Sequence, residues 1–347
     1  MVTVQPEKLE SFVRGVLRAA GAREAAAALV ARSLVGSNLA GHDSHGVIRV
    51  AEYLAATAAG QLDLTAEPSV VQDLPAVARV DGHHGFGQVT ADFAVRYGVD
   101  MVGSVGLAAV GLANCKHVGR LGEWVELAAT EGVVGLAFAN GAHPGGLVTP
   151  YGSLEPFFGT NPVAAGVPVT GGDPIVVDFA TSMVAEGKVR VARNRGESLP
   201  EGLIQDKRGR PTTDPHDLYD GGTLLTIAAH KGSALSLLVE LLGGVLTGQG
   251  VPGLPSYDRF RNGVLFLLLS TDLFRPAQAF LDEAAEVAEH LRTLRPAPGF
   301  TNIMVPGDPE RGQAERRSRE GIPIDPTTWD QLATTASELG VEVPHPG

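Results

Sequence analysis

The stretch LAAVGLANCKHVGRLGEWVELAATEGVVGLAFAN, residues 107–140, decides the fold class of this chain. Residues 107–114 and 133–140 are short runs that are almost continuously apolar, which is typical of strands buried on both faces of a sheet. Residues 120–132 lie between them and carry apolar side chains at helical spacing. A strand, a helix and a second strand in succession predict α/β structure.

The sequence on either side continues this alternation. Further strands are predicted at residues 69–72, 76–80, 163–169, 174–180 and 264–270, and helices at 89–103, 183–193, 231–247, 276–294 and 327–339. Glycine and proline gather at 141–172 and 248–256, which predicts loops there. Residues 1–60 instead have helical periodicity, with Leu9, Phe12 and Val16 on one face, so we expect a helical N-terminal region.

Composition limits the function classes. The chain has 347 residues and a formal net charge of −12, which argues against nucleic acid or an anionic membrane as the main partner. Its single cysteine, Cys115, excludes an intramolecular disulfide and a cysteine-rich metal site. The densest apolar run, residues 264–269, is too short to cross a bilayer, and the N-terminus lacks the apolar core of a secretory signal. We therefore expect a cytoplasmic globular protein.

A cluster of polar residues interrupts the helical region. The stretch GHDSHGVIRV, residues 41–50, contains two histidines, an aspartate, a serine and an arginine. His42 and His45 have the i, i+3 spacing that can present two nitrogens to one metal, although no H-x-x-x-H or C-x-x-C motif supplies a further ligand. These residues alone leave three interpretations open: a solvated loop between helices, an acid/base site and a metal site.

Arg49 favours the acid/base interpretation. It follows His45 by four positions, about one helical turn, so both side chains can reach one small molecule. A guanidinium grips a carboxylate with two parallel hydrogen bonds, and an imidazole titrates near neutral pH. Together these two groups suit a 2-oxo or 2-hydroxy acid.

Two junctions between a strand and a helix supply further candidates. His117 follows the strand at 107–114, in a turn before the next helix. Asp178 closes the strand at 174–180, and Thr181 and Ser182 are expected to open the following helix, where hydroxyls and backbone N–H groups can face a ligand. Ordinary helix capping explains each of these positions equally well when it is taken singly.

A third junction suits a phosphate group. His230, Lys231 and Gly232 are expected at the start of a helix, where a positive charge and free backbone N–H groups meet, although a solvated loop lysine also explains them. Several such junctions in one chain favour a cofactor site. The stretch GQGVPG, residues 248–253, matches the G-x-G-x-x-G fingerprint, but it follows a helical pattern and contains Pro252, so we predict a turn there.

The motifs occur in the order found in a known family. GHDSHGVIR (41–49), KHVGRLGEW (116–124), GTNP (159–162), VVDFATS (176–182), HKGSAL (230–235) and VPGDPE (305–310) together resemble the malate/L-lactate dehydrogenase family. This is the second, non-Rossmann type of 2-hydroxy acid dehydrogenase, and KHVGRLGEW is most similar to its hydroxycarboxylate dehydrogenase B branch. The resemblance extends from about Val4 to Glu320.

The resemblance implies a role for each matching residue. His45 would exchange a proton with the substrate oxygen, Ser44 and Arg49 would bind the substrate carboxylate, and His117 and Asp178 would complete the catalytic group. The implied cofactor-binding residues are Asn140, Asp178, Phe179, Ala180, Thr181, Ser182, His230, Lys231, Gly307 and Asp308. No metal is implied. The cofactor would be NAD or NADP, with NAD preferred, in a non-Rossmann α/β binding domain, and the protein would be a homodimer.

This reading divides the chain into three segments. We expect a helical region at 1–66 that carries the substrate motif and packs with 300–347, a small α/β segment at 67–112 and a cofactor-binding domain at 113–299. One departure from the family pattern concerns Ala228 and Ala229, which stand just before the H-K-G motif where members usually carry glycine.

The predicted function is an NAD(P)-dependent oxidoreductase acting on a small 2-hydroxy acid/2-oxo acid pair of the lactate, malate or aryl-lactate type. Three alternatives stay open: a reductase of a cyclic 2-imino acid, a metal-dependent hydrolase that uses His42, Asp43 and His45, and a cofactor-binding regulatory protein without turnover. The identity of the acid, the choice of nicotinamide and the physiological direction are left open by the sequence.

Overall fold

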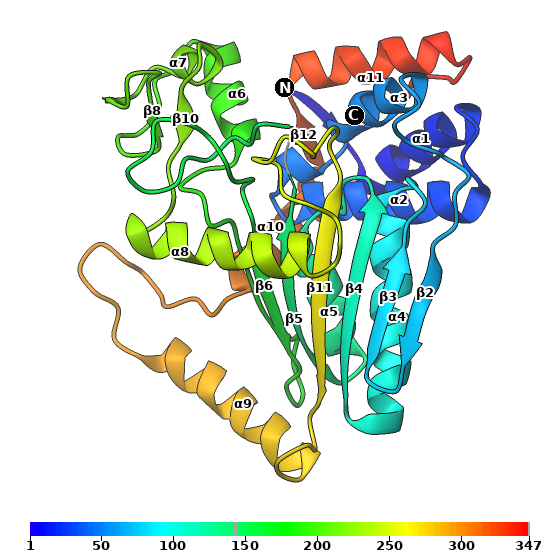
Figure 1. Cartoon of the computed structure of the whole chain (residues 1–347), viewed down its shortest axis with the longest axis vertical. Coiled ribbons are helices and arrows are strands. Elements are labelled where there is room, and N and C mark those ends of the chain that lie inside the picture. The colour runs from blue at the N-terminus through cyan, green and yellow to red at the C-terminus, as the bar shows by residue number, and fades with distance from the viewer. Residues whose placement is uncertain (142–143, 346–347) are drawn as a thin grey trace.

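A seven-stranded mixed sheet forms the centre of the computed structural model, which describes residues 1–141 and 144–345 (Figure 1). In sheet order its strands are β2 (Ser69–Leu74), β3 (Val77–Asp81), β4 (Leu107–Cys115), β11 (Asn262–Ser270), β5 (Val133–Asn140), β6 (Val163–Val167) and β7 (Ile175–Phe179). Only β3 and β4 pair in parallel, and every other neighbouring pair is antiparallel. This is not the parallel sheet of a Rossmann fold, which agrees with the interpretation of GQGVPG as a turn and not as a dinucleotide-binding fingerprint.

The two apolar strands of 107–140 are present but do not pair with each other. β11 lies between β4 and β5 and pairs with both along its length. Its sequence, NGVLFLLLS, is buried from Asn262 to Phe266 and at Leu268, as a central strand requires. The predicted alternation is therefore confirmed, and the strand that completes the centre of the sheet comes from far along the chain.

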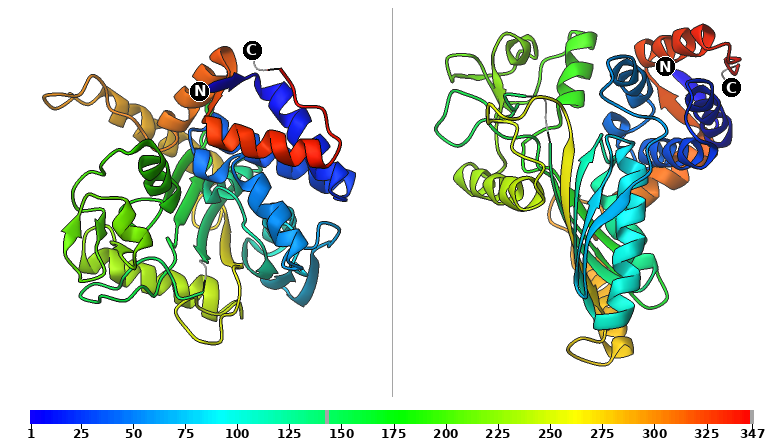
Figure 2. Two further views of the ribbon diagram at one scale, coloured as in Figure 1. Left: turned by 90° about the horizontal axis from the view of Figure 1, so that it is seen from above. Right: turned by 45° about the vertical axis from the view of Figure 1, so that its right-hand side comes forward.

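Helices cover both faces of the sheet (Figure 2). α4 (Gly87–Val105) and α5 (Leu121–Thr130) pack on one face, and α8 (His230–Val239) with a π-helical turn (Glu240–Val245) covers the other. Close approach depends on small residues, because a Cβ built at Gly98 of α4 would lie 2.5 Å from Leu268 of β11. A Cβ at Gly166 of β6 would lie 2.1 Å from the Val125 carbonyl oxygen of α5.

The N-terminal helices and the C-terminal residues form one unit. α1 (Pro6–Ala19), α2 (Glu24–Leu39) and α3 (Arg49–Ala58) share a core with β12 (Ile322–Ile324) and α11 (Pro326–Glu338), and α10 (Asp308–Glu320) contacts α2. β1 (Val2–Val4) pairs antiparallel with β12, so both ends of the chain lie in this unit (Figure 1). The predicted apolar face of the first helix is confirmed, because Leu9, Phe12 and Val16 are buried.

A smaller lobe and one outlying helix complete the fold. The lobe contains the short strands β8 (Ile204–Gln205), β9 (Pro211–Thr212) and β10 (Thr223–Leu224) with α6 (Glu186–Arg195) and α7 (His216–Tyr219), around its own apolar cluster. α9 (Ala277–Thr293) stands away from this lobe, beside the far end of the sheet (Figure 1). None of the helices within 1–141 and 144–345 combines the length and apolar character that a membrane span requires.

Two details differ from the sequence expectations. Thr181 and Ser182 do not open a helix, because Ser182 forms a bridge with Thr226 and α6 begins only at Glu186. The helix α10 was not anticipated beyond the turn at its start. The division into segments at residues 66, 112 and 299 stays a prediction, and β4 lies across the boundary at 112.

Candidate active site

The loop between α2 and α3 is held in one conformation by its neighbours. Residues Asp43–His45 form a single 3₁₀ turn. Asn38 fixes both ends of it, because its Nδ2 donates to Asp43 Oδ1 at 2.6 Å and its Oδ1 accepts from the Val47 amide at 2.9 Å. A Cβ at Gly46 would lie 2.2 Å from Asn38 Oδ1, so only glycine fits there.

Asp43 is an anchor of this loop. Arg317 of α10 donates to its two carboxylate oxygens at 2.6 and 3.1 Å and also contacts the Asn38 carbonyl oxygen. Among the residues that the structure describes, no group of three His, Cys, Asp or Glu side chains could hold a metal ion. The metal-dependent hydrolase built on His42, Asp43 and His45 is therefore not supported, because Asp43 already serves a structural ion pair.

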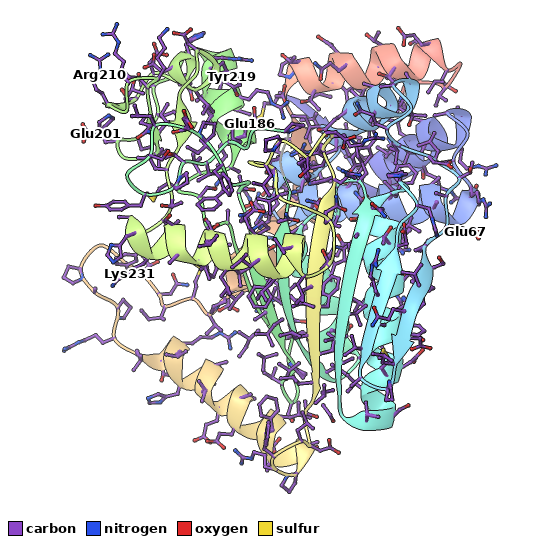
Figure 3. All side chains as sticks on the ribbon, in the orientation of Figure 1. Glu67, Glu186, Glu201, Arg210, Tyr219 and Lys231 are labelled. Atoms are coloured by element: carbon purple, nitrogen blue, oxygen red, sulfur yellow. The ribbon has the colours of Figure 1, made fainter. Side chains whose placement is uncertain are left out.

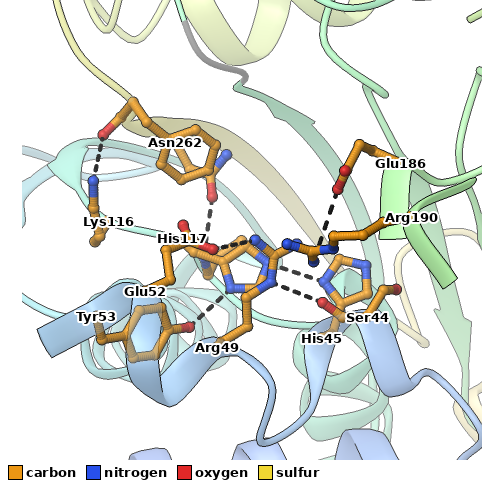
Figure 4. A network of polar contacts seen from close by, with 12 residues as sticks. Ser44, His45, Arg49, Glu52, Tyr53, Lys116, His117, Glu186, Arg190 and Asn262 are labelled. Atoms are coloured by element: carbon orange, nitrogen blue, oxygen red, sulfur yellow. Dashed lines mark hydrogen bonds and ion pairs between the residues drawn. The ribbon is translucent and has the colours of Figure 1, made fainter. Parts of the chain in front are cut away.

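The structure brings together the two predicted acid/base histidines (Figure 4). His45 Nδ1 lies 2.9 Å from His117 Nε2, and the rings are nearly parallel, with an interplanar angle of 3°. Tyr53 Oη lies 2.9 Å from His117 Nδ1. Burial, with the nearby charge of Arg49, lowers the pKa of His45 to about 3 and also lowers the pKa of His117. Both imidazoles are therefore neutral at neutral pH.

Arg49 and Ser44 lie beside this pair. The Arg49 Nε donates to the Ser44 carbonyl oxygen at 2.8 Å, and its Nη1 forms an ion pair with Glu52 at 2.6 Å. Ser44 itself lines the main cavity, whereas Arg49 does not. A Cβ at Gly187 would lie 2.8 Å from the Ser44 Cβ, so glycine lets the start of α6 approach the loop closely.

Asp178, the second-last residue of β7, lies next to the start of α5. The Gly122 amide donates to its Oδ2 at 2.7 Å. Burial raises the pKa of the Asp178 carboxyl, and the Gly122 hydrogen bond and the charge of Arg120 act in the opposite direction. The carboxyl is thus held in a fixed position at the edge of the cavity.

A cavity of about 920 Å³ connects these groups. It lies between the 41–48 loop, the end of β7 and α6, and its lining includes Ser44, His45, Asp178, Phe179, Ala180, Ser182, Met183, Lys188 and Arg195. Its volume is at the upper end of the range of about 300–1,000 Å³ found for small-molecule and cofactor sites. Apolar side chains in the lining could contact the nicotinamide ring, and cationic side chains could bind the phosphate groups. The lining residues therefore fit a nicotinamide dinucleotide.

Several predicted cofactor residues do not line this cavity. Asn140 is buried and donates to Glu240 and to the Gly250 carbonyl oxygen, each at 2.8 Å. Thr181 is fully buried, with its hydroxyl 2.9 Å from the Asn161 carbonyl oxygen. Both side chains are thus engaged in holding the loops around β5 and β7.

The residues at the starts of α8 and α10 lie elsewhere. His230 and Lys231 are exposed, and Figure 3 shows Lys231 at the outer end of α8. The Asp308 carboxylate accepts from Arg292 at 2.8 Å and from Arg311 at 2.9 Å. Gly307 lines a second cavity of about 240 Å³ that shares Asp178 and Glu310 with the main one.

Sequence reasoning missed some residues of the site. Lys188 lines the main cavity, and it lies in the helix that was predicted at 183–193, just after VVDFATS. Arg317 and Asn38 position the histidine loop, but Arg317 lies 274 positions from its partner Asp43 and sits in a helix without an apolar pattern. No local signal identifies such a contact.

Comparison with known proteins assigns the family. The family model for malate/L-lactate dehydrogenase matches residues 4–333. Hydroxycarboxylate dehydrogenase B of Escherichia coli strain K12 is 34% identical over 341 residues, covering 96% of this chain and 94% of that protein. A Δ1-pyrroline-2-carboxylate/Δ1-piperideine-2-carboxylate reductase of Pseudomonas syringae pv. tomato is 39% identical over 341 residues, covering 96% of each.

Solved structures agree with this assignment. A putative malate/lactate dehydrogenase from E. coli superposes with a TM-score of 0.91 at 33% identity, covering 98% of this chain and 96% of that one. Sulfolactate dehydrogenase from Methanocaldococcus jannaschii gives 0.88 at 30% identity, covering 98% of both chains. The chain belongs to the malate/L-lactate dehydrogenase family and is an oxidoreductase, and its family implies a nicotinamide cofactor.

Proposed function

We propose that this enzyme interconverts a small 2-hydroxy acid and its 2-oxo acid, with NAD preferred over NADP. The observation that carries the proposal is the pair of neutral histidines, His45 at the cavity wall and His117 buried behind it, 2.9 Å apart, with the Arg49 guanidinium bonded to the adjacent Ser44. A group that exchanges a proton beside a group that binds a carboxylate is what this reaction needs. The relatives named as malate, sulfolactate and hydroxycarboxylate dehydrogenases support the substrate class.

Each residue then has a defined task. The nicotinamide, when bound, supplies or accepts the hydride at substrate C2. His45 Nε2 exchanges the proton with the oxygen on C2, because its Nδ1 is occupied by His117. Ser44 and the Nη2 side of Arg49 bind the carboxylate. Phe179, Ala180, Ser182 and Lys188, with Asp178 fixed beside them, would hold the cofactor, and we propose Asn140, Thr181, His230, Lys231, Gly307 and Asp308 as further contributors to that site.

A reductase of a cyclic 2-imino acid is the second candidate, because a relative with that name is 39% identical to this chain. The same proton donor and carboxylate-binding arginine could serve a cyclic imine. The test is the rate of NADH and NADPH oxidation with pyruvate, oxaloacetate, phenylpyruvate and Δ1-piperideine-2-carboxylate. If the imine is turned over fastest, the enzyme is a reductase of cyclic 2-imino acids. If none of the compounds is turned over, both candidate functions are contradicted and a cofactor-binding protein without turnover is the remaining interpretation.

We also propose a cytoplasmic homodimer without nucleic-acid or membrane partners. Exposed apolar side chains on two helical surfaces support self-association: Leu237, Leu241 and Leu246 on one, with exposed fractions of 47%, 47% and 67%, and Val287 and Leu291 on α9, with 52% and 39%. Patches of this kind mark protein–protein contacts more often than free surface. Sedimentation at assay concentration should give about twice the 36.0 kDa chain mass, and a species of one chain mass would contradict the dimer.

A further inference from the structure

The hydrogen bonds at the active site continue beyond the two histidines into the protein interior. Tyr53 of α3 is fully buried, and its Oη lies 2.9 Å from His117 Nδ1. Gln88, the second residue of α4, is also fully buried, and its Nε2 donates to Tyr53 Oη at 2.8 Å. Four side chains from four separate parts of the chain thus form one line that ends at the cavity.

The direction of this line determines where each proton lies. A phenol has one proton, and because the Tyr53 oxygen accepts from Gln88, that proton is free to be donated to His117 Nδ1. His117 then carries its own proton on Nε2 and donates it to His45 Nδ1. His45 is left with its proton on Nε2, the nitrogen that is available to a ligand in the cavity.

This arrangement raises a chemical difficulty that the line itself can resolve. Burial keeps both histidines neutral, so His45 does not have the second proton of an imidazolium. A neutral imidazole that gives up its Nε2 proton becomes an anion unless another proton reaches Nδ1 at the same time. His117 is in place to provide that proton, and Tyr53 is in place to replace it.

We propose that Tyr53 is the source of the replacement proton and that Gln88 is a positioning residue which holds the phenol oxygen in the correct orientation; this rests on the function proposed above. In the reduction, the O–H bond of the product forms as the His45 Nε2–H bond breaks. His117 Nε2 gives its proton to His45 Nδ1, and Tyr53 gives its proton to His117 Nδ1. Tyr53 is left as a phenolate that accepts from Gln88, and a water proton entering at His45 Nε2 after product release restores the line.

The surroundings of Tyr53 agree with this role. Burial raises the pKa of its hydroxyl, and the charges of Glu52 and Glu123 add to this, whereas the charge of Arg49 and the hydrogen bond from Gln88 lower it. The phenol therefore keeps its proton at rest, and the hydrogen bond from Gln88 is the direct contact that favours the phenolate. Gln88 Oε1 has no hydrogen-bond partner among the described residues, so the bond from Nε2 to Tyr53 is the one hydrogen bond that this buried amide makes with them.

Tyr53→Phe tests the proton source. With phenylpyruvate and NADH, kcat should fall about tenfold to a hundredfold, less than the roughly 10²–10⁴-fold of a direct general acid/base because Tyr53 acts through His117, with the KM for NADH unchanged. The matched control is Tyr257→Phe, which removes another buried phenol bonded to a carbonyl oxygen, that of Arg261. Rates in mixtures of H₂O and D₂O should give a curved proton inventory for the wild type and a less curved one for Tyr53→Phe, in which fewer protons move together.

Gln88→Met tests the positioning role without the loss of a ring. It should lower kcat about fivefold, the effect of one neutral hydrogen bond. Gln205→Met is its control, because Gln205 is also buried and donates through Nε2 to one oxygen, that of Ser153. If Tyr53→Phe does not fold, Gln88→Met and the wild-type proton inventory decide, and a straight wild-type inventory overturns the relay.

A measurement without substrate separates this proposal from the proposed function. The ¹⁵N NMR spectrum of histidine-labelled protein, assigned with His45→Asn and His117→Asn, should show Nε2–H on both rings. Protons on Nδ1 of both rings would overturn the direction of the line. If no acid or imine is turned over, the proposed function fails, while the NMR result still decides on the hydrogen-bond line.

Discussion

Replacing Ala229 by glycine should stabilise the protein. Ala229 has φ +55° and ψ −122°, a combination that residues with a Cβ rarely adopt, and its neighbour Ala228 also has a positive φ of +46°. The surrounding chain enforces this turn: Thr226 Oγ1 donates to the Ala229 carbonyl oxygen at 2.9 Å, and the Ile227 amide donates to Thr181 at 2.9 Å. These hydrogen bonds therefore hold Ala229 in a backbone conformation that its Cβ makes energetically unfavourable.

The magnitude follows from two opposing effects. A residue held in such a region costs about 1–3 kcal/mol. Glycine removes this cost but makes the unfolded chain more flexible, which costs about 0.5–1 kcal/mol. Ala229→Gly should therefore raise the free energy of unfolding by about 0.5–2 kcal/mol.

The assay is urea unfolding followed by circular dichroism, with Ala234→Gly as the control. Ala234 is an exposed residue within α8, so glycine there should lower the free energy of unfolding by about 1 kcal/mol. The midpoint should move to higher urea for Ala229→Gly and to lower urea for Ala234→Gly, with unchanged slopes. Equal losses in both variants would refute the reasoning, because strain at Ala229 would then contribute nothing.

Three further predictions concern the site. Arg49→Lys keeps the charge but loses the planar group that bonds Ser44 and Glu52 while presenting Nη2 to the carboxylate, so kcat/KM for pyruvate should fall about tenfold to a hundredfold, and equal losses on acetone would make Arg49 structural. Lys188→Ala should raise the KM for NADH about tenfold. Lys231→Ala tests the cofactor contact that the family resemblance implies for this exposed residue. For either variant, an unchanged KM for NADH would show that the residue does not contact the cofactor. Burial lowers the pKa of His45 from 6.5 to about 3 in the folded protein. Between these two pH values the unfolded chain binds a proton at His45 and the folded protein does not, so stability is complete above pH 6.5 and is lost as the pH falls toward 3. The free energy of unfolding should drop in that window by up to about 1.4 kcal/mol per pH unit, a slope that His45→Asn should reduce.

The sequence predicted what local patterns encode. The strands and the helix within 107–140 are clear because apolar residues repeat at the spacing of each element. The position of β11 between β4 and β5 is not encoded locally, since pairing partners so far apart leave no pattern in either strand. The helix α10 was missed for a different reason: DPERGQAERRSRE has almost no apolar residue, so no periodicity marks it.

The site shows the same limit. His45 and His117 were each identified from their residue type and neighbours, but their contact at 2.9 Å joins positions 72 apart in the chain. Gln88 offered no signal, because a glutamine near the start of a helix is usually solvated, and only the fold buries it beside Tyr53.

The pairing of β1 with β12 has a consequence for synthesis of the protein on the ribosome. The loop that carries His45 is anchored by Arg317, and the unit around it is completed by Ile322 and Ile324. A nascent chain that has emerged from the ribosome only as far as the central sheet lacks these residues, so its N-terminal helices cannot yet form their complete hydrophobic core. His45, the proposed acid/base residue, is therefore made among the first residues and reaches its final position among the last.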